Sequence, residues 1–182
     1  MGKKNSAGLV EWYDKLSDGY EELYATEQSV KYQRAMGWVD GHRFDLAVDV
    51  ACGTGLFLDR VRRKCSYVVG VDLSRRMLEK ARTRLKFEDV GLVRADCSAL
   101  PLREKVADCL FAISLIEEGS ESRKQVLELH RIAKTGGFVV VSVFHPEGRK
   151  VDLGRLGLEL VKHHTELSPR EDLLVVRRAA IG

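Results

Sequence analysis

The chain has 182 residues, of which 45% are hydrophobic and 31% are charged. This composition excludes a disordered chain, and the length suffices for one well-buried core. The net charge of +3 permits an RNA or another anionic partner without indicating one, and no stretch approaches the roughly 20 apolar residues of a membrane-spanning helix. We therefore expect a cytoplasmic protein with no membrane association.

Residues 8–36 are predicted to be helical. Apolar and aromatic side chains recur there at three- and four-residue steps, which is the period of one helix face. This face either packs against the domain or covers a binding site. Its members are Leu9, Trp12, Tyr13, Leu16, Tyr20, Leu23 and Tyr24.

Residues 46–64 are predicted to form a buried strand, a glycine turn and a helix. The strand is short, apolar and rich in valine, and it ends at Gly53-Thr54-Gly55, where small residues let a ligand approach the backbone. The helix is expected over Leu56–Lys64. A strand, glycine turn and helix in this order form a nucleotide-binding unit.

Residues 67–72 are predicted to form a second buried strand, which ends in Asp72. Asp72 follows the first strand at about the 20-residue spacing at which an acidic side chain meets the ribose hydroxyls of a nucleotide. A carboxylate suits two hydroxyl donors because it only accepts hydrogen bonds. The turn and Asp72 together predict a site for an adenosine-containing ligand.

The turn favours a positively charged ligand over a dinucleotide. A dinucleotide-binding turn has a third glycine at the position that Leu58 occupies here. Asp49 precedes the turn, and its carboxylate would repel a diphosphate but attract an ammonium or sulfonium group. An NAD(P)-dependent oxidoreductase is therefore the less favoured alternative.

Two segments resemble the class I S-adenosylmethionine-dependent methyltransferase family. Asp49-Val50-Ala51-Cys52-Gly53-Thr54-Gly55 is similar to its first motif, and Gly70-Val71-Asp72-Leu73-Ser74 to its second. Ala51 replaces a glycine of many members, a change that we expect to be neutral. Trp12-Tyr13-Asp14 and Tyr20-Glu21 resemble the N-terminal signature of small members that act in ubiquinone or menaquinone biosynthesis or on tRNA. The resemblance implies S-adenosylmethionine as cofactor, S-adenosylhomocysteine as product and a small-molecule or RNA acceptor.

The resemblance also implies which residues contact the cofactor. Asp72 would accept from the ribose, Asp96 from the adenine amino group, and the Cys97 amide would meet a ring nitrogen. Tyr20 would belong to a lid. The expected cofactor-binding residues are Asp49, Ala51, Cys52, Gly53, Thr54, Gly55, Asp72, Leu73, Met77, Asp96, Cys97, Ala112, Ser114 and Tyr20.

The remaining pattern alternates helices and strands. Ser74 is expected to cap a helix that extends to about Phe87, and its many Lys and Arg residues indicate a solvated face or a phosphate-binding surface. Such alternation predicts an α/β fold with a doubly wound, Rossmann-like, mainly parallel seven-stranded sheet and a C-terminal antiparallel strand pair. The other expected strands are 90–95, 108–115, 138–144, 159–165 and 173–178, and the other expected helices are 121–133 and 151–158.

We expect a single methyltransferase domain over residues 1–182, with residues 1–40 as a helical lid and 41–182 as the cofactor-binding core. The presumed edge strand at 92–95 could pair with an activator protein. A non-catalytic or partner-dependent cofactor-binding protein remains an alternative.

No catalytic base is assigned; the candidates are His145, Glu117 and Tyr13. The segment Ser114-Leu115-Ile116-Glu117 lacks the Asn-Pro-Pro-Tyr type motif of family members that act on DNA or glutamine, so no DNA partner is expected. The histidines and four cysteines lack metal-ligand spacing, which predicts no metal site and buried, reduced thiols.

Overall fold

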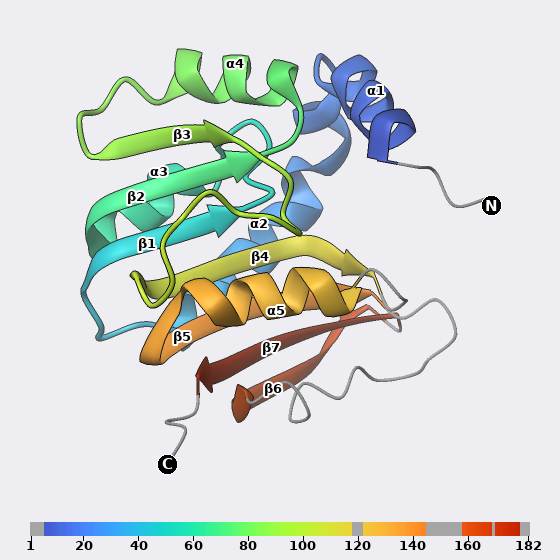
Figure 1. Ribbon diagram of the computed structural model, residues 1–182. Coiled ribbons are helices and arrows are strands. Elements are labelled where there is room, and N and C mark those ends of the chain that lie inside the picture. The colour runs from blue at the N-terminus through green and yellow to red at the C-terminus, as the bar shows by residue number, and fades with distance from the viewer. Residues whose placement is uncertain (1–5, 118–121, 145–157, 169, 179–182) are drawn as a thin grey trace.

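A seven-stranded sheet forms the centre of the computed structural model, which describes residues 6–117, 122–144, 158–168 and 170–178. The strand order is β3-β2-β1-β4-β5-β7-β6 (Figure 1). Neighbours from β3 to β5 are parallel, whereas β7 is antiparallel to β5 and β6. The predicted fold class is confirmed. The strands are β1 (Phe44–Val50), β2 (Cys65–Asp72), β3 (Val90–Arg94), β4 (Ala107–Glu117), β5 (Ala133–Phe144), β6 (Leu158–Ser168) and β7 (Glu171–Arg178).

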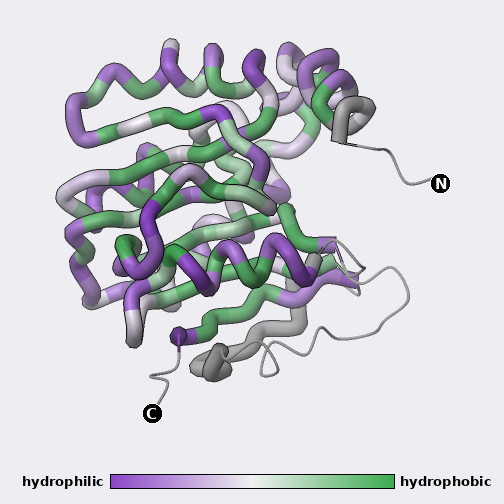
Figure 2. The backbone as a smooth tube through the Cα atoms, in the orientation of Figure 1, coloured by the Kyte–Doolittle hydropathy of each residue, from purple (hydrophilic) through white to green (hydrophobic). Residues whose placement is uncertain are grey.

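Helices cover both faces of the sheet (Figure 1). One apolar cluster joins α2 (Tyr20–Trp38) and α3 (Leu58–Val61) to alternate residues of the central strands, such as Ala47 and Val68. The intervening residues, such as Val48, face α5 (Ser122–Ile132) in a second cluster. Figure 2 shows the apolar residues concentrated along the central strands. Because side chains alternate between the faces of a strand, strands buried on both faces are apolar throughout.

The helical prediction over residues 8–36 is confirmed, and two helices occupy this stretch. They are α1 (Ser6–Leu16) and α2, and the break between them is Ser17-Asp18-Gly19. The Gly19 N–H donates to the Leu16 carbonyl at 3.0 Å, and the Ser17 hydroxyl donates to the Asp14 carbonyl at 2.8 Å. These residue types are poor helix formers that bond to nearby backbone groups instead.

The helix predicted over residues 56–64 is shorter than expected. The turn continues to Phe57, α3 spans only Leu58–Val61, and a 3₁₀ helix, η1 (Arg62–Lys64), follows. Ser74 caps α4 (Arg75–Arg84) as predicted, since its Oγ accepts from the Met77 N–H at 3.1 Å. This helix ends before the expected Phe87.

The C-terminal strands confirm the predicted antiparallel pair and extend it at both strands. The helix expected at 151–158 falls on residues 151–157, which lie outside the described residues, and on Leu158, where β6 begins. The strand predicted at the sheet edge is confirmed as β3. Within the described ranges, no helix is both long and apolar enough to span a bilayer.

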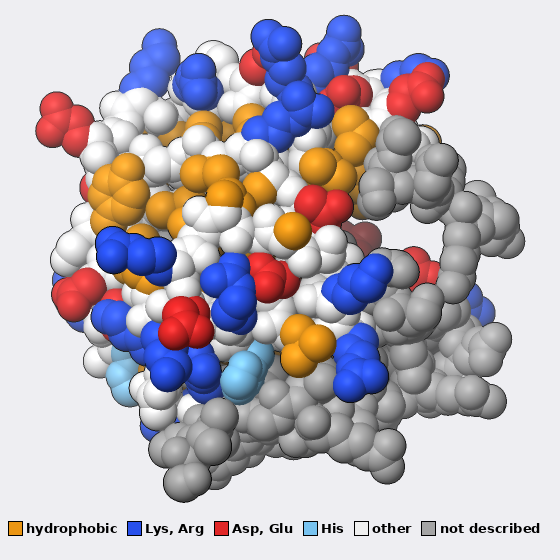
Figure 3. All heavy atoms as spheres, viewed as in Figure 1, with side chains coloured by type: hydrophobic (Ala, Val, Ile, Leu, Met, Phe, Trp, Pro, Cys, Tyr) orange, Lys and Arg blue, Asp and Glu red, His pale blue; other side chains and the backbone are white. Residues whose placement is uncertain are grey.

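Lys and Arg side chains gather over α4 (Figure 3). Several of them form ion pairs, which supports the solvated-face interpretation of this helix. Two of these pairs connect α4 to the N-terminal helices and to the link between them. The pairs are Arg75–Glu79 at 2.9 Å, Lys80–Asp18 at 2.9 Å and Arg84–Glu21 at 2.5 Å.

Close packing around Gly70 in β2 leaves no room for a side chain. A Cβ at this position would lie 2.5 Å from Leu58 Cδ1 and 2.9 Å from Cys52 Sγ. We expect Gly70→Ala to lower the free energy of unfolding by about 1–3 kcal/mol, measured by urea denaturation. The control Gly37→Ala lies in α2 with nothing within 4 Å of the added Cβ, so it should not destabilise. Equal stability of both variants would contradict the packing explanation.

Candidate functional site

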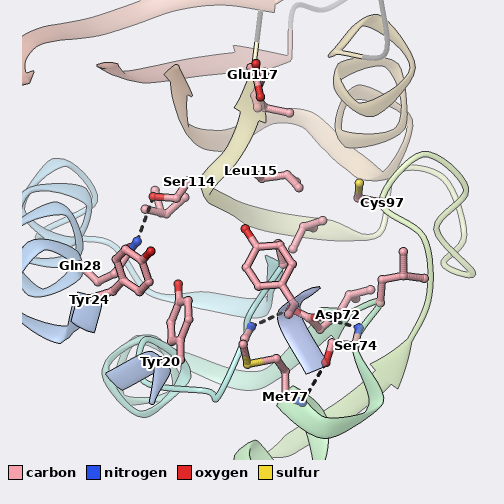
Figure 4. A pocket seen from close by; sticks show the side chains of 18 of the residues that line it. Tyr20, Tyr24, Gln28, Asp72, Ser74, Met77, Cys97, Ser114, Leu115 and Glu117 are labelled. Carbon is pink, nitrogen blue, oxygen red and sulfur yellow. Dashed lines mark hydrogen bonds between the residues drawn. The ribbon is translucent and has the colours of Figure 1, made fainter. Parts of the chain in front are cut away.

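The carboxyl ends of β1, β2 and β4 meet at one cavity of about 530 Å³. In a doubly wound sheet, ligands bind at this edge, where the strand order reverses between β1 and β4. The N-terminal helices α1 and α2 complete its walls. Figure 4 shows Tyr20, Tyr24 and Gln28 on the α2 wall and Cys97 on the opposite wall.

The turn after β1 places three residues in the left-handed region of backbone conformation. Their φ angles are 63° at Ala51, 54° at Gly53 and 77° at Gly55. Glycine adopts this conformation without strain, but for alanine it costs about 1–2 kcal/mol. The substitution of Ala51 for glycine is therefore not neutral, contrary to expectation. Such local strain is characteristic of functional sites.

Asp72 joins the glycine turn to the segment that follows β2. Its Oδ2 accepts from the Gly53 N–H at 2.8 Å, and its Oδ1 accepts from the Ser74 N–H at 2.8 Å. Burial raises the pKa of this carboxyl group, and the backbone amides of Ser74, Gly53 and Leu73 partly oppose that effect. A ligand that donates hydrogen bonds to the carboxylate would offset the energetic cost of burying its charge.

Asp49 lies behind the turn and does not line the cavity. Its residue is 3% exposed, and its Oδ2 has no hydrogen-bond partner in the described part of the chain. Burial, and secondarily the Asp72 carboxylate, raise the pKa of Asp49 well above its usual value. A buried carboxylate without a partner is costly, and the raised pKa reduces this cost because it favours the neutral, protonated form.

Helix α1 is anchored beside Asp72. Asp14 accepts a hydrogen bond from the Ser74 hydroxyl and, at 3.4 Å, from the Arg76 N–H. Tyr13, which precedes Asp14 in α1, and Tyr20, at the start of α2, both line the cavity. Burial is the main cause that raises the pKa of both phenols, so they remain neutral hydrogen-bonding groups at neutral pH.

A buried lysine, which the sequence analysis missed, lies at the other end of the cavity. The Nζ of Lys31 lies 2.7 Å from Glu171 Oε2, 2.8 Å from Glu27 Oε1 and 2.8 Å from Ser114 Oγ. Gln28 also donates to Ser114 Oγ, at 3.1 Å. Lys31 shares one face of α2 with Tyr24, Gln28 and Ala35, at steps of three and four residues. This spacing is the sequence signal that could have identified Lys31 as part of the site.

Ser114 is held in an unusual conformation at the end of β4. Its φ is 58°, and its N–H donates to Ser142 Oγ at 2.6 Å. Its Oγ accepts from both Lys31 and Gln28, so both hydroxyl lone pairs are used and the O–H remains as a donor. Ser114 lines the cavity, and this donor is therefore placed to meet a ligand.

The predicted cofactor residues divide into two groups. Eight of them line the cavity, whereas the others lie behind or beside it. Asp96 accepts from the Ser98 N–H at 2.8 Å and from the Ser98 hydroxyl at 2.7 Å, which lowers its pKa and closes a turn. The lining residues are Tyr20, Ala51, Gly53, Asp72, Leu73, Met77, Cys97 and Ser114; the others are Asp49, Cys52, Thr54, Gly55, Asp96 and Ala112.

Two of the three candidate bases line the cavity, namely Tyr13 and Glu117. His145 lies outside the described residues. Cys97 also lines the cavity; its Sγ accepts from the Gln125 amide at 3.3 Å, and burial raises its pKa to about 11. No group of three or more His, Cys, Asp or Glu residues in the described ranges is arranged to hold a metal ion.

Comparison with known families identifies the domain. Residues 48–141, more than half of the chain, match the family described as "Methyltransferase domain". The chain belongs to this methyltransferase-domain family. The matched range contains the glycine turn, Asp72 and Ser114, and the predicted membership of a class I S-adenosylmethionine-dependent methyltransferase family is confirmed.

Named relatives within the methyltransferase group differ in their acceptors. A malonyl-[acyl-carrier protein] O-methyltransferase from Marinomonas sp. (strain MWYL1) is 28% identical over 179 residues, which cover 94% of this chain and 65% of the relative. A demethylmenaquinone methyltransferase from Clavibacter sepedonicus is 34% identical over 146 residues, which cover 80% of this chain and 56% of the relative. The chain therefore spans less than two thirds of each relative.

Solved structures share the fold at low sequence identity. A chain of the complex between the Haloferax volcanii Trm112 methyltransferase activator and a methyltransferase has a TM-score of 0.80 at 15% identity, over 93% of this chain and 97% of that chain. The [4+2]-cyclase SpnF has a TM-score of 0.80 at 14% identity, over 99% of this chain and 98% of that chain. The N-methyltransferase NodS from Bradyrhizobium japonicum WM9, in complex with S-adenosylhomocysteine, has a TM-score of 0.68 at 13% identity, over 85% of this chain and 88% of that chain.

The raised pKa of Asp49 predicts that the free energy of unfolding depends on pH. Because the folded-state pKa lies above the unfolded value of about 3.9, the folded state binds the proton more tightly. Relative to Asp49→Asn, the ligand-free wild type should lose stability as pH rises from about 3.9 through the raised pKa. Urea denaturation across this pH range measures the difference. Parallel pH profiles of the two proteins would contradict the assignment.

Lys31 is predicted to be essential for stability. Glu171 has a side chain that is only 9% exposed, so Lys31→Met leaves an uncompensated buried carboxylate. We expect a loss of about 3–5 kcal/mol in the free energy of unfolding, partly recovered in Lys31→Met/Glu171→Gln. The control Lys15→Met removes an exposed pair with Glu11 and should change stability by about 0.5 kcal/mol or less. A Lys31→Met effect as small as this control would refute the prediction.

Proposed function

We propose that this cavity binds S-adenosylmethionine and that the protein transfers its methyl group to a small-molecule or RNA acceptor. The observation that carries the proposal is Asp72, whose carboxylate lines the cavity at the end of β2 and is positioned by Gly53 and Ser74. Family membership supports the same reaction class. When bound, the cofactor supplies an activated methyl group on a positively charged sulfur.

The residues present fit this cofactor. Asp72 would accept from the ribose hydroxyls, while Leu73, Met77 and Cys97 would line the adenine site. The Asp72 carboxylate and the neutral phenols of Tyr13 and Tyr20, which line the cavity, would favour a cationic sulfur.

Lys31 is the group that fits the carboxylate of the cofactor's methionine part. Its side chain is 6% exposed, and its partner Glu27 is 59% exposed and is therefore the anion most readily displaced. Ala51, Gly53 and Ser114 would lie along the methionine part. We propose that α1 and α2 act as a lid and that residues 1–182 form a single domain, as the N-terminal anchor at Asp14 supports.

Transfer requires mainly alignment, because the cofactor carries its own leaving group. An acceptor that loses a proton during the reaction also needs a base. Tyr13 is unsuited to this role, since its raised pKa keeps the phenol protonated. We propose that Glu117, which lines the cavity at the end of β4, accepts that proton.

We also propose a partner and a location for the protein. The edge strand β3 would accept a strand from an activator protein, as suggested by the Trm112 activator complex of the structural neighbour. The four free cysteines support a reducing, cytoplasmic location. Malonyl-[acyl-carrier protein] and demethylmenaquinone belong to the names of longer relatives, and we do not carry them over to this chain.

Ligand binding tests the proposed function. S-adenosylhomocysteine at a hundredfold excess over its Kd should raise the free energy of unfolding by about 2.7 kcal/mol. Asp72→Ala should remove most of this gain because the ribose loses its acceptor. The control Asp45→Ala changes an exposed carboxylate at the amino end of β1 and should retain the gain. If the wild type gains no stability, the proposed function is wrong.

A further inference from the structure

Four charged side chains line the part of the cavity that lies away from Asp72. This region lies around Ser114 and Glu117, away from Asp72 (Figure 4), and three carboxylates line it together with one ammonium group. No other Lys or Arg among the described residues lines the cavity. The charged residues are Glu27, Lys31, Glu117 and Glu171.

The single ammonium group has no hydrogen-bond donor left for an anionic acceptor. A lysine ammonium carries three N–H donors, and Glu27, Glu171 and Ser114 each take one of them. If the cofactor's carboxylate replaces Glu27, all three donors remain in use and the Glu27 carboxylate is released. An acceptor carboxylate would therefore meet repulsion without a free cationic partner in the described cavity wall.

The same walls suit a positively charged donor. Glu171 gives only Oε2 to Lys31, and a carboxylate can accept about four hydrogen bonds. Aromatic rings from α1 and α2 line the cavity as well, with the Tyr20 and Tyr24 rings 5.2 Å apart. The faces of such rings attract ammonium groups. The acidic groups and the aromatic rings therefore both favour a positively charged acceptor.

We propose that the acceptor is an alkyl amine, an inference that rests on the proposed function. The amine binds as an ammonium ion and gives one proton to the Glu117 carboxylate, which frees its lone pair. A bond then forms between this nitrogen and the methyl carbon, while the carbon–sulfur bond breaks and its electron pair stays on sulfur. The products are a methylated ammonium ion and a neutral thioether, and Glu117 returns its proton to water.

Three cofactor analogues test the proposal without knowledge of the natural acceptor. In each, nitrogen replaces the sulfur of S-adenosylhomocysteine and carries an arm in place of the transferred methyl group: 2-aminoethyl, propyl or carboxymethyl. Titration calorimetry gives their Kd values, with S-adenosylhomocysteine as reference. We expect the aminoethyl analogue to bind about tenfold or more tightly than the carboxymethyl analogue, with the neutral propyl analogue between them and a smaller spread at high ionic strength.

Two matched variants test whether Glu117 causes the preference for the aminoethyl arm. Glu117→Gln should reduce the preference for the aminoethyl arm severalfold, whereas Glu88→Gln, at an exposed site that does not line the cavity, should leave it unchanged. Equal or tighter binding of the carboxymethyl analogue would overturn the amine proposal while leaving the proposed function intact. Failure of S-adenosylhomocysteine itself to bind would overturn the proposed function and the amine proposal together.

Discussion

The hydrogen bonds of the Asp72 carboxylate organise the whole site. One oxygen holds the glycine turn through Gly53, and the other holds the start of the α4 segment through Ser74. Ser74 in turn caps α4 and donates to Asp14, which anchors α1. Asp72 therefore connects the turn after β1 to the end of β2 and, through Ser74 and Asp14, to helix α1.

The site maintains features that oppose stability. Ala51 and Ser114 adopt left-handed backbone conformations, and the Asp49 carboxylate is buried with one unpartnered oxygen. Lys31 and Glu171 form a buried ion pair, whose desolvation offsets much of its attraction. These costs gather around one cavity, whereas the sheet core is apolar on both faces. Such local strain is expected at positions where ligand binding, rather than folding, determines which residue type is present.

Local sequence predicted the parts of the site that lie within single motifs. The apolar runs before Gly53 and Asp72 indicated parallel strands, and Ser74 was recognised as a helix cap. The Lys31–Glu171 pair was not predicted, because α2 and β7 are far apart in sequence and meet only in the folded sheet. Asp96 shows a further limit, since the choice between a ligand contact and the turn to Ser98 depends on side-chain direction. The likeness to the cyclase SpnF confirms that the fold alone does not specify the reaction.

A crystal structure of the protein with S-adenosylhomocysteine tests the role of Asp72 most directly. We expect the ribose hydroxyls to donate to Asp72 while its bonds to Gly53 and Ser74 persist, and the homocysteine part to extend toward Ser114 and Lys31. An empty cavity in crystals grown at saturating ligand, or a ribose that does not contact Asp72, would contradict this role.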